Sequence, residues 1–320
     1  MNNTIILKAL GGALVAYLLS MIGGYIFIKM MVKIKISQPI NPDGPATHYK
    51  KEGTPTAGGL FFILSAFITL LIFGDLKNYY ILIPLIAMGV FALIGFLDDF
   101  LKLVKKDAIG LTTLQKLALQ ILGGAFVFYF YSQWATPNTN FGSWYPLFFL
   151  IYFGIIVNGV NISDGLDGLA VGIAMSPLLL LIVLTIFISV NNPDSMNLLL
   201  VLSSVMGSLL AFLWYNGSKA QVFMGDVGSH ALGALIAISA LLLKVELIIL
   251  LASALFFIEV FSSFLQIISI RLFSKKVFHM APLHHHFEKK GVSESRIVVR
   301  FQIASAVSTV AAALIFLRGI

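Results

Sequence analysis

The feature that most constrains the fold of this chain is a series of apolar segments, each close to the length of a membrane-spanning helix. A helix needs roughly 20 mainly apolar residues to cross the hydrocarbon layer of a bilayer. Ten such segments lie near residues 5–28, 58–74, 78–97, 116–132, 145–160, 169–190, 197–215, 230–245, 247–270 and 297–317. We therefore expect an all-α integral membrane protein with about ten transmembrane helices, built by residues 1–320 as a single polytopic membrane domain. Two of the shorter, glycine-containing segments would also suit re-entrant helices.

The composition excludes an ordinary water-soluble domain. Hydrophobic residues make up 59% of the chain and charged residues 11%. In a typical globular domain about 45–50% of the residues are apolar and about 25% are charged. Because Cys is absent, disulfides, thiolate catalysis and cysteine-ligated metal sites are excluded. The net charge of +7 suits loops that face anionic membrane lipid, and we expect no nucleic-acid partner.

The charged residues are divided unequally between the two sides of the expected membrane. Of the 21 Lys and Arg residues, all but Lys8, Lys77, Lys244 and Arg318 lie on one side. The positive-inside rule makes that side cytoplasmic and places both termini outside the cytoplasm. The same side holds all six His and all but four of the 14 acids, the exceptions being Asp75, Asp194, Glu246 and Glu259. Because acids contribute little to topology, this surplus indicates an active site at the cytoplasmic face.

Two adjacent acids, Asp98 and Asp99, end the third apolar segment. Carboxylates at a membrane boundary are costly unless they bind a cation or handle a proton. Lys102 follows them at helical spacing and is near enough to pair with either, so a solvated ion pair is the alternative interpretation. Lys116 begins the next segment, where it is either a positive-inside anchor or a ligand for an anion.

The densest polar stretch holds Asn158, Asn161, Asp164 and Asp167, which are spaced three residues apart. On a continuous helix they would form one polar stripe, whereas the interleaved glycines favour a broken helix or a loop. Two acids buried here without cations would only destabilise the protein. Either geometry therefore predicts a convergent polar site beneath an apolar segment.

Three further segments on the same side carry chemistry. Asp226 lies between glycines at the start of a span, where hard oxygen ligands and the absence of Cys point to Mg²⁺ rather than zinc. The triple histidine 284–286 lies among lysines, which suits anion binding or proton handling better than a zinc site. Residues 53–59 are rich in glycine and hydroxyls, which suits either phosphate contact or a tight helix start.

Taken together, the motifs resemble the polyprenyl-phosphate N-acetylhexosamine-1-phosphate transferases. The motifs that carry the resemblance are GTPTAGG (53–59), FLDDFLK (96–102), KLALQ (116–120), NGVNISDGLDGLA (158–170), FMGDVGSHALG (223–233) and MAPLHHHFE (280–288). The last motif favours the muramoyl-pentapeptide branch over the GlcNAc-1-phosphate branch. The chain departs from the family pattern at Ala57, usually Met, and at His230, usually apolar.

The resemblance implies an enzyme of the bacterial plasma membrane that makes lipid I and UMP from UDP-MurNAc-pentapeptide and undecaprenyl phosphate, with Mg²⁺ and as a homodimer. It implies that Asp226 ligates Mg²⁺, that Asp98 deprotonates or orients the lipid phosphate, and that Asp99 supports the site. By the same resemblance, Lys51, Thr56, Lys102 and Lys116 bind phosphate or uridine. Asn161, Asp164 and Asp167 bind the nucleotide and the surroundings of the metal, and Phe223 stacks on uracil. His284, His285 and His286 bind the diphosphate or sugar end, and His284 also has a catalytic role.

Several alternatives remain open from the sequence. The same chemistry could use UDP-GlcNAc as donor, and Asp98 or Asp226 could act as a nucleophile in place of direct attack by the lipid phosphate. A cation-coupled transporter would also have about ten spans, but its ionisable groups should lie on both sides of the membrane. Glu259, which lies within a span, could line a groove for the lipid tail or form a hydrogen bond between helices.

Overall fold

The computed structural model describes residues 3–34, 53–105, 110–135 and 139–319, and in these residues it contains helices but no strand. The α-helices are α1 (Asn3–Lys33), α2 (Gly59–Phe73), α3 (Tyr79–Lys105), α4 (Thr113–Trp134), α5 (Tyr145–Ser163), α6 (Leu169–Ile188), α7 (Asn197–Asn216), α8 (Gly225–Leu243), α9 (Glu246–Ala252), α10 (Ala254–Phe273), α11 (Leu283–Lys289) and α12 (Glu294–Arg318). Two 3₁₀ turns, η2 (Thr139–Trp144) and η3 (Pro193–Met196), precede α5 and α7. The prediction of an all-helical chain is confirmed.

Each of the ten predicted apolar segments forms helix, but not every helix has spanning length. Nine helices in the described part of the chain are long and apolar enough to cross a membrane. Helix α2 has only 15 residues, which at 1.5 Å per residue is shorter than the roughly 30 Å of a bilayer core. The segment predicted at 247–270 divides at Ser253 into α9 and α10. Neither Pro nor Gly marks this division in the sequence.

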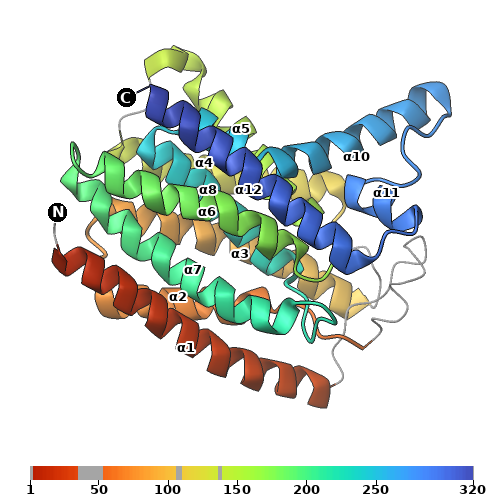
Figure 1. Ribbon diagram of the computed structural model, residues 1–320, viewed down its shortest axis with the longest axis horizontal. Coiled ribbons are helices and arrows are strands. Elements are labelled where there is room, and N and C mark those ends of the chain that lie inside the picture. Colours follow the sequence, from red (N-terminus) through yellow and green to blue (C-terminus); the bar gives the residue numbers. More distant parts are fainter. Residues whose placement is uncertain (1–2, 35–52, 106–109, 136–138, 320) are drawn as a thin grey trace.

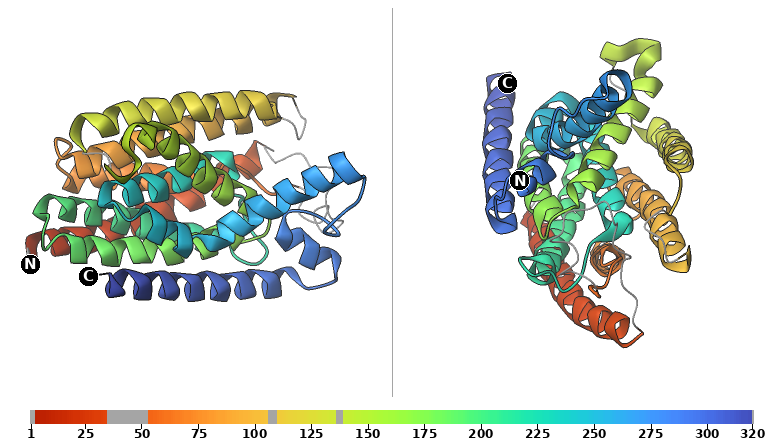
Figure 2. Two further views of the ribbon diagram at one scale, coloured as in Figure 1. Left: turned by 90° about the horizontal axis from the view of Figure 1, so that it is seen from above. Right: turned by 90° about the vertical axis from the view of Figure 1, so that its right-hand side faces the viewer.

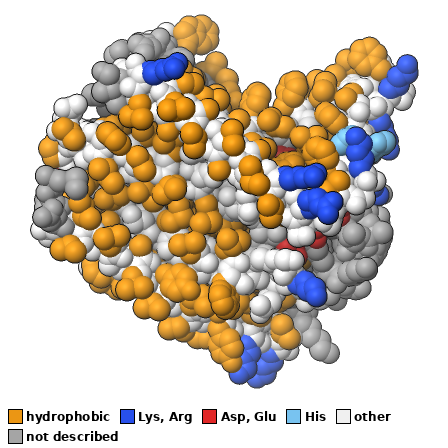
Figure 3. All heavy atoms as spheres, in the orientation of Figure 1, with side chains coloured by type: hydrophobic (Ala, Val, Ile, Leu, Met, Phe, Trp, Pro, Cys, Tyr) orange, Lys and Arg blue, Asp and Glu red, His pale blue; other side chains and the backbone are white. Residues whose placement is uncertain are grey.

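The helices form a bundle around α8, whose residues from Asp226 to Leu243 are all buried. Helix α8 packs against α3, α5, α2 and α6, while α1, α4 and α12 lie at the periphery (Figures 1 and 2). The peripheral helices expose large apolar side chains such as Leu7, Leu114 and Val307. Hydrophobic side chains are accordingly spread widely over the face in Figure 3, as expected of a lipid-exposed surface.

Glycines allow the backbone of α8 to approach its neighbours closely at the end that carries Asp226. A Cβ at Gly95 of α3 would lie closer than 3.0 Å to the carbonyl oxygen of Asp226. A Cβ at Gly59 of α2 would likewise overlap the backbone of Gly228. Small residues at such crossings bring helices together in membranes, and here they fix the start of α8 beside the end of α3.

The two termini lie at the same end of the bundle, and α10 and α11 extend at the other (Figures 1 and 2). On the face seen in Figure 3, the acidic and histidine side chains lie on the α10–α11 half, together with most of the Lys and Arg. Because α3 ends and α8 begins at this end, the residues predicted to form the active site gather there.

Candidate active site

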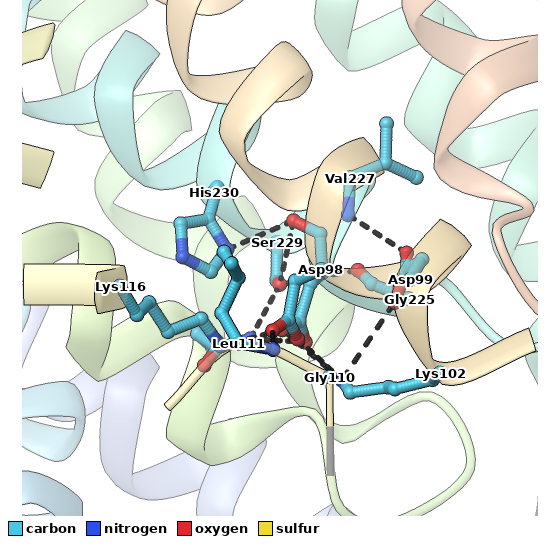
Figure 4. A network of polar contacts seen from close by, with 12 residues as sticks. Asp98, Asp99, Lys102, Gly110, Leu111, Lys116, Gly225, Val227, Ser229 and His230 are labelled. Carbon is cyan, nitrogen blue, oxygen red and sulfur yellow. Dashed lines mark hydrogen bonds and ion pairs between the residues drawn. The ribbon is translucent and has the colours of Figure 1, made fainter. Parts of the chain in front are cut away.

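Three carboxylates from two helices meet at the end of the bundle opposite the termini. Asp98 and Asp99 lie in the last two turns of α3, and Asp226 is the second residue of α8. One oxygen of each lies within 4.8 Å of the others, and all three residues are buried. The structure therefore brings together acids that are about 130 residues apart in sequence; Figure 4 shows Asp98 and Asp99 beside Gly225 and Val227 of α8.

Two lysines hold these carboxylates together. The Lys102 Nζ lies 2.7 Å from an Asp98 oxygen, 3.2 Å from Asp226 Oδ2 and 3.8 Å from an Asp99 oxygen. The Lys116 Nζ, at the start of α4, lies 2.5 Å from Asp226 Oδ2 and 3.5 Å from Asp98 Oδ2. Lys102 thus pairs with both adjacent acids, and Lys116 is a partner of the cluster as well as a cation at a helix start. A solvated helix-end ion pair does not describe this geometry.

Each carboxylate has its other oxygen fixed by a neighbouring N–H group. The Leu111 backbone N–H donates to Asp98 Oδ1 at 2.7 Å, and the Val227 N–H donates to Asp99 Oδ2 at 3.1 Å. The Asn161 amide donates to Asp226 Oδ1 at 2.8 Å. These bonds orient the remaining oxygens toward the two lysines (Figure 4). Such pre-oriented carboxylates lose little freedom on binding a cation.

The oxygens of this cluster fit a hard divalent cation. Mg²⁺ prefers a few carboxylate oxygens and keeps several waters. Asp98 Oδ2 is buried and accepts no hydrogen bond from the described residues, although it is ion-paired with Lys102. Asp226 retains 12% of its side-chain surface exposed, so it is the carboxylate of the three that a metal and its waters reach most directly.

The Asn/Asp stretch forms a helix end followed by a loop, as its glycines indicated. Helix α5 ends at Ser163 and α6 begins at Leu169, so Asn161 lies on helix while Asp164 and Asp167 lie in the loop. Burial and the nearby charges of Asp226 and Asp99 raise the pKa of Asp164 to about 8. Protonation of Asp164 is therefore favoured at higher pH than for an ordinary aspartate.

The glycine-rich segment 53–59 lies beside the start of α8. The Phe223 N–H donates to the Pro55 carbonyl and the Gly58 N–H donates to the Phe223 carbonyl, both at 2.8 Å. Thr56 is buried, and its hydroxyl has no hydrogen-bond partner in the described structure. Phe223 is half-buried next to it. Lys51 lies outside the described residues.

The three histidines of α11 have different surroundings. His284 is fully buried, and its Nδ1 lies 3.0 Å from a Glu259 oxygen. His285 contacts Glu288 at 2.9 Å, and burial lowers the pKa of its imidazole. His286 accepts a hydrogen bond from the His279 backbone N–H. Glu259 has no exposed surface, so it forms the interhelical hydrogen bond anticipated from the sequence and does not line an open groove.

Other residues support the site through contacts that the sequence analysis did not predict. Glu294 accepts a hydrogen bond from the Asp167 N–H at 2.7 Å, and Asn216 accepts one from the Gly168 N–H. Gln120 lies 3.1 Å from His230, whose other ring nitrogen lies 2.9 Å from the Asp226 carbonyl. The contacts of Glu294, Asn216 and Gln120 join segments 48 to 127 residues apart in sequence, so no local spacing could have identified them, whereas the contact between His230 and Asp226 follows helical spacing.

Comparison with known proteins identifies the family. Residues 81–244 match the family model of glycosyl transferase family 4. Over 311 residues the chain is 39% identical to the phospho-N-acetylmuramoyl-pentapeptide-transferase of Clostridium perfringens strain 13, covering 94% of this chain and 96% of the relative. Relatives of the same name from Clostridium botulinum strain Alaska E43 and Desulforapulum autotrophicum are 39% and 38% identical, over 95% and 92% of this chain and 94% and 89% of their own lengths. The chain is therefore a phosphoglycosyl transferase and belongs to the family of the phospho-N-acetylmuramoyl-pentapeptide-transferases.

Proposed function

We propose that this protein transfers phospho-MurNAc-pentapeptide from UDP-MurNAc-pentapeptide to undecaprenyl phosphate, giving lipid I and UMP in an Mg²⁺-dependent reaction. The observation that carries the proposal is the cluster of Asp98, Asp99 and Asp226 with Lys102 and Lys116 at one end of an apolar bundle. One substrate is a water-soluble polyanion and the other a lipid with a phosphate head. A site at the membrane boundary that presents both cations and carboxylates suits this pair.

The residues of the cluster have distinct proposed roles. Asp98 orients or deprotonates the lipid phosphate, and its position between two lysines keeps it next to bound anions. Lys102 and Lys116 neutralise the diphosphate, because phosphoryl transfer depends on positioning and charge neutralisation. Asp99 fixes the start of α8 through the Val227 N–H. Mg²⁺ held by Asp226 would screen the charge on the diphosphate of the donor.

The surrounding segments would bind the rest of the donor. Phe223 would stack on uracil beside Thr56, and Lys51 would contact phosphate or uridine. Asn161, Asp164 and Asp167 would hold the nucleotide and the surroundings of the metal. The α11 residues His284, His285 and His286 would serve the diphosphate or sugar end.

We propose that the site faces the cytoplasm of a bacterial cell and that both termini lie outside it. The unequal distribution of Lys and Arg supports this orientation, and the two termini lie at the same end of the bundle, opposite the site (Figure 2). We further propose a single polytopic membrane domain that forms a homodimer, as the family resemblance implies.

The test is release of UMP by detergent-purified protein supplied with UDP-MurNAc-pentapeptide, a polyprenyl phosphate and Mg²⁺, with the Asp226→Asn variant measured beside it. Lipid-dependent UMP that disappears with EDTA and falls at least about a hundredfold in the variant is the expected result. Turnover with UDP-GlcNAc but not with this donor would keep the chemistry and change the substrate. Folded protein that releases no UMP from either donor would refute the proposal and favour the transporter alternative.

Direct attack by the lipid phosphate is the mechanism that we propose, because a phosphate monoester dianion is already a nucleophile. In the alternative mechanism, Asp98 or Asp226 forms a covalent phospho-enzyme. A covalent route would release UMP from donor alone, in an amount equal to the enzyme present. An Asp98→Asn protein with near-normal turnover would contradict both the base role and the nucleophile role of Asp98.

A further inference from the structure

A second buried acid lies outside the carboxylate cluster. Glu259 on α10 and His284 on α11 have side chains with no exposed surface, and Glu259 Oε2 lies 3.0 Å from His284 Nδ1. A buried carboxylate and imidazole are costly to desolvate unless they bond to each other. This contact therefore fixes which nitrogen of His284 faces α10: Nδ1 donates to Glu259.

The remaining atoms of this pair are enclosed by protein. Glu259 Oε1 and His284 Nε2 are buried and form no hydrogen bond in the described structure. His284 Nε2 instead packs against Gly165, where an added Cβ would overlap the imidazole ring. The imidazole of His284 is therefore enclosed between Glu259 on one side and Gly165 on the other.

The pair joins three segments at one point. Glu259 belongs to α10, His284 to α11, and Gly165 to the loop that carries Asp164 and Asp167. Figure 1 shows α11 beneath the outward end of α10. His285, next along α11, is only partly exposed and contacts Glu288. The position of His285 relative to the Asp164 loop consequently depends on where His284 is held.

We propose that Glu259 is a positioning residue that acts through His284 Nδ1 to hold α11 against the Asp164 loop, and that it thereby sets the affinity for the phosphosugar end of the donor. The inference rests on the proposed function, since it assigns that end of the donor to α11. A carboxylate that fixes the tautomer and orientation of a histidine is a common supporting device around functional sites. Because His284 is itself buried, its orientation would act on the donor through the positions of its neighbours, His285 and the Asp164 loop.

Amide substitutions separate this role from direct chemistry at His284. The amide nitrogen of His284→Asn takes the place of Nδ1 and can still donate to Glu259, whereas that of His284→Gln takes the place of Nε2. In the same way, Glu259→Gln keeps an oxygen acceptor for Nδ1, and Glu259→Leu removes it. We expect Glu259→Gln to keep the donor KM within about threefold of the wild-type value, and His284→Asn to raise the donor KM several-fold less than His284→Gln does. His284→Gln and Glu259→Leu should raise it about ten- to a hundredfold, with the KM for the polyprenyl phosphate unchanged.

A double-mutant cycle between Gly165 and His284 gives an independent test. Gly165→Ala should displace the imidazole and raise the donor KM, and in that background His284→Ala should cost much less than it does alone. Additive effects would overturn the claim that the two act through one contact.

The reverse amide pattern, with His284→Gln active and His284→Asn inactive, would show that Nε2 contacts substrate and would overturn the proposal. The proposal would also be overturned if all four substitutions of His284 and Glu259 lowered kcat and the thermal midpoint equally, without a selective change in donor KM. That result would indicate a purely structural pair. Wild-type protein is assayed in parallel. If the proposed function itself were wrong, the wild type would release no UMP, so the two kinds of failure can be distinguished.

Discussion

Replacement of Gly95 by alanine would test whether the contact between α3 and α8 positions the active site. A Cβ at Gly95 would lie closer than 3.0 Å to the Asp226 carbonyl oxygen and carbon and to the Val227 nitrogen. Backbone atoms cannot rotate away as a flexible side chain does, so the two helices must separate. Asp98 and Asp99 follow Gly95 within about one turn on α3, and Asp226 is the residue struck on α8. The two halves of the cluster would therefore move apart.

The expected magnitudes differ for stability and for activity. Overpacking costs about 1–3 kcal/mol, and the better helix propensity of alanine returns about 1 kcal/mol, so Gly95→Ala should lower the thermal midpoint by a few degrees only. A displacement of about 1 Å between reacting groups costs about 10²-fold in rate. We therefore expect kcat for UMP release to fall about a hundredfold in protein that remains folded.

Gly89 on the same helix provides the matched control. A Cβ there would meet only Phe67, at an ordinary contact distance of 3.7 Å, so Gly89→Ala should keep full activity and lose no stability. The assay is the initial rate of UMP release at saturating substrates, with the thermal midpoint recorded on the same samples. If Gly95→Ala turned over as fast as Gly89→Ala, the claim that this crossing sets the site geometry would be refuted.

Three further substitutions have definite expected outcomes. The pKa of Asp164 is raised to about 8 in the folded protein, whereas in the unfolded chain an aspartate loses its proton above about pH 4. The free energy of unfolding therefore falls as the pH rises from about 4 to about 8, by at most about 6 kcal/mol. Asp164→Asn should therefore raise the thermal midpoint of metal-free protein more at pH 8 than at pH 5, and an equal gain at both would contradict the assignment. Lys116→Met should raise the donor KM and also destabilise the protein, since it leaves the carboxylates less neutralised; calorimetric titration with UMP and thermal scans check the two parts. Phe223→Leu should weaken UMP binding about tenfold without changing Mg²⁺ affinity, whereas equal weakening of both would argue against stacking on uracil.

The sequence predicted those parts of the fold that depend on local pattern. Spanning helices follow from segment length and hydropathy, and the loop at 164–168 follows from its glycines. The division of one segment at Ser253 was not predictable, because Ala252, Ser253 and Ala254 are compatible with a continuous helix. The two parts have different neighbours, because α9 packs mainly against α12 and α10 mainly against α5.

The carboxylates and lysines of the cluster could be noticed in the sequence, but their contacts could not be predicted from it. Carboxylates and lysines at a membrane boundary are unusual enough to be noticed singly. Their mutual arrangement depends on helix crossings, as at Gly95, which hydropathy does not encode. The pairing of Glu259 with His284 across 25 residues likewise depends on how α11 folds back, so the sequence left two alternatives for Glu259 where the structure shows one.

The lysine contacts also indicate how the site can accommodate substrates. Three carboxylates and two ammonium groups leave a formal charge of −1 at the cluster, and both proposed substrates are anions. We therefore expect phosphate oxygens to bind by replacing the aspartates as ion-pair partners of Lys102 and Lys116. The carboxylate oxygens released in this way would then be able to bind a cation. Substrate and metal should then bind with positive coupling, and by linkage each should tighten the other by the same factor. Equal Mg²⁺ affinities with and without UMP would show that the lysines do not make this exchange.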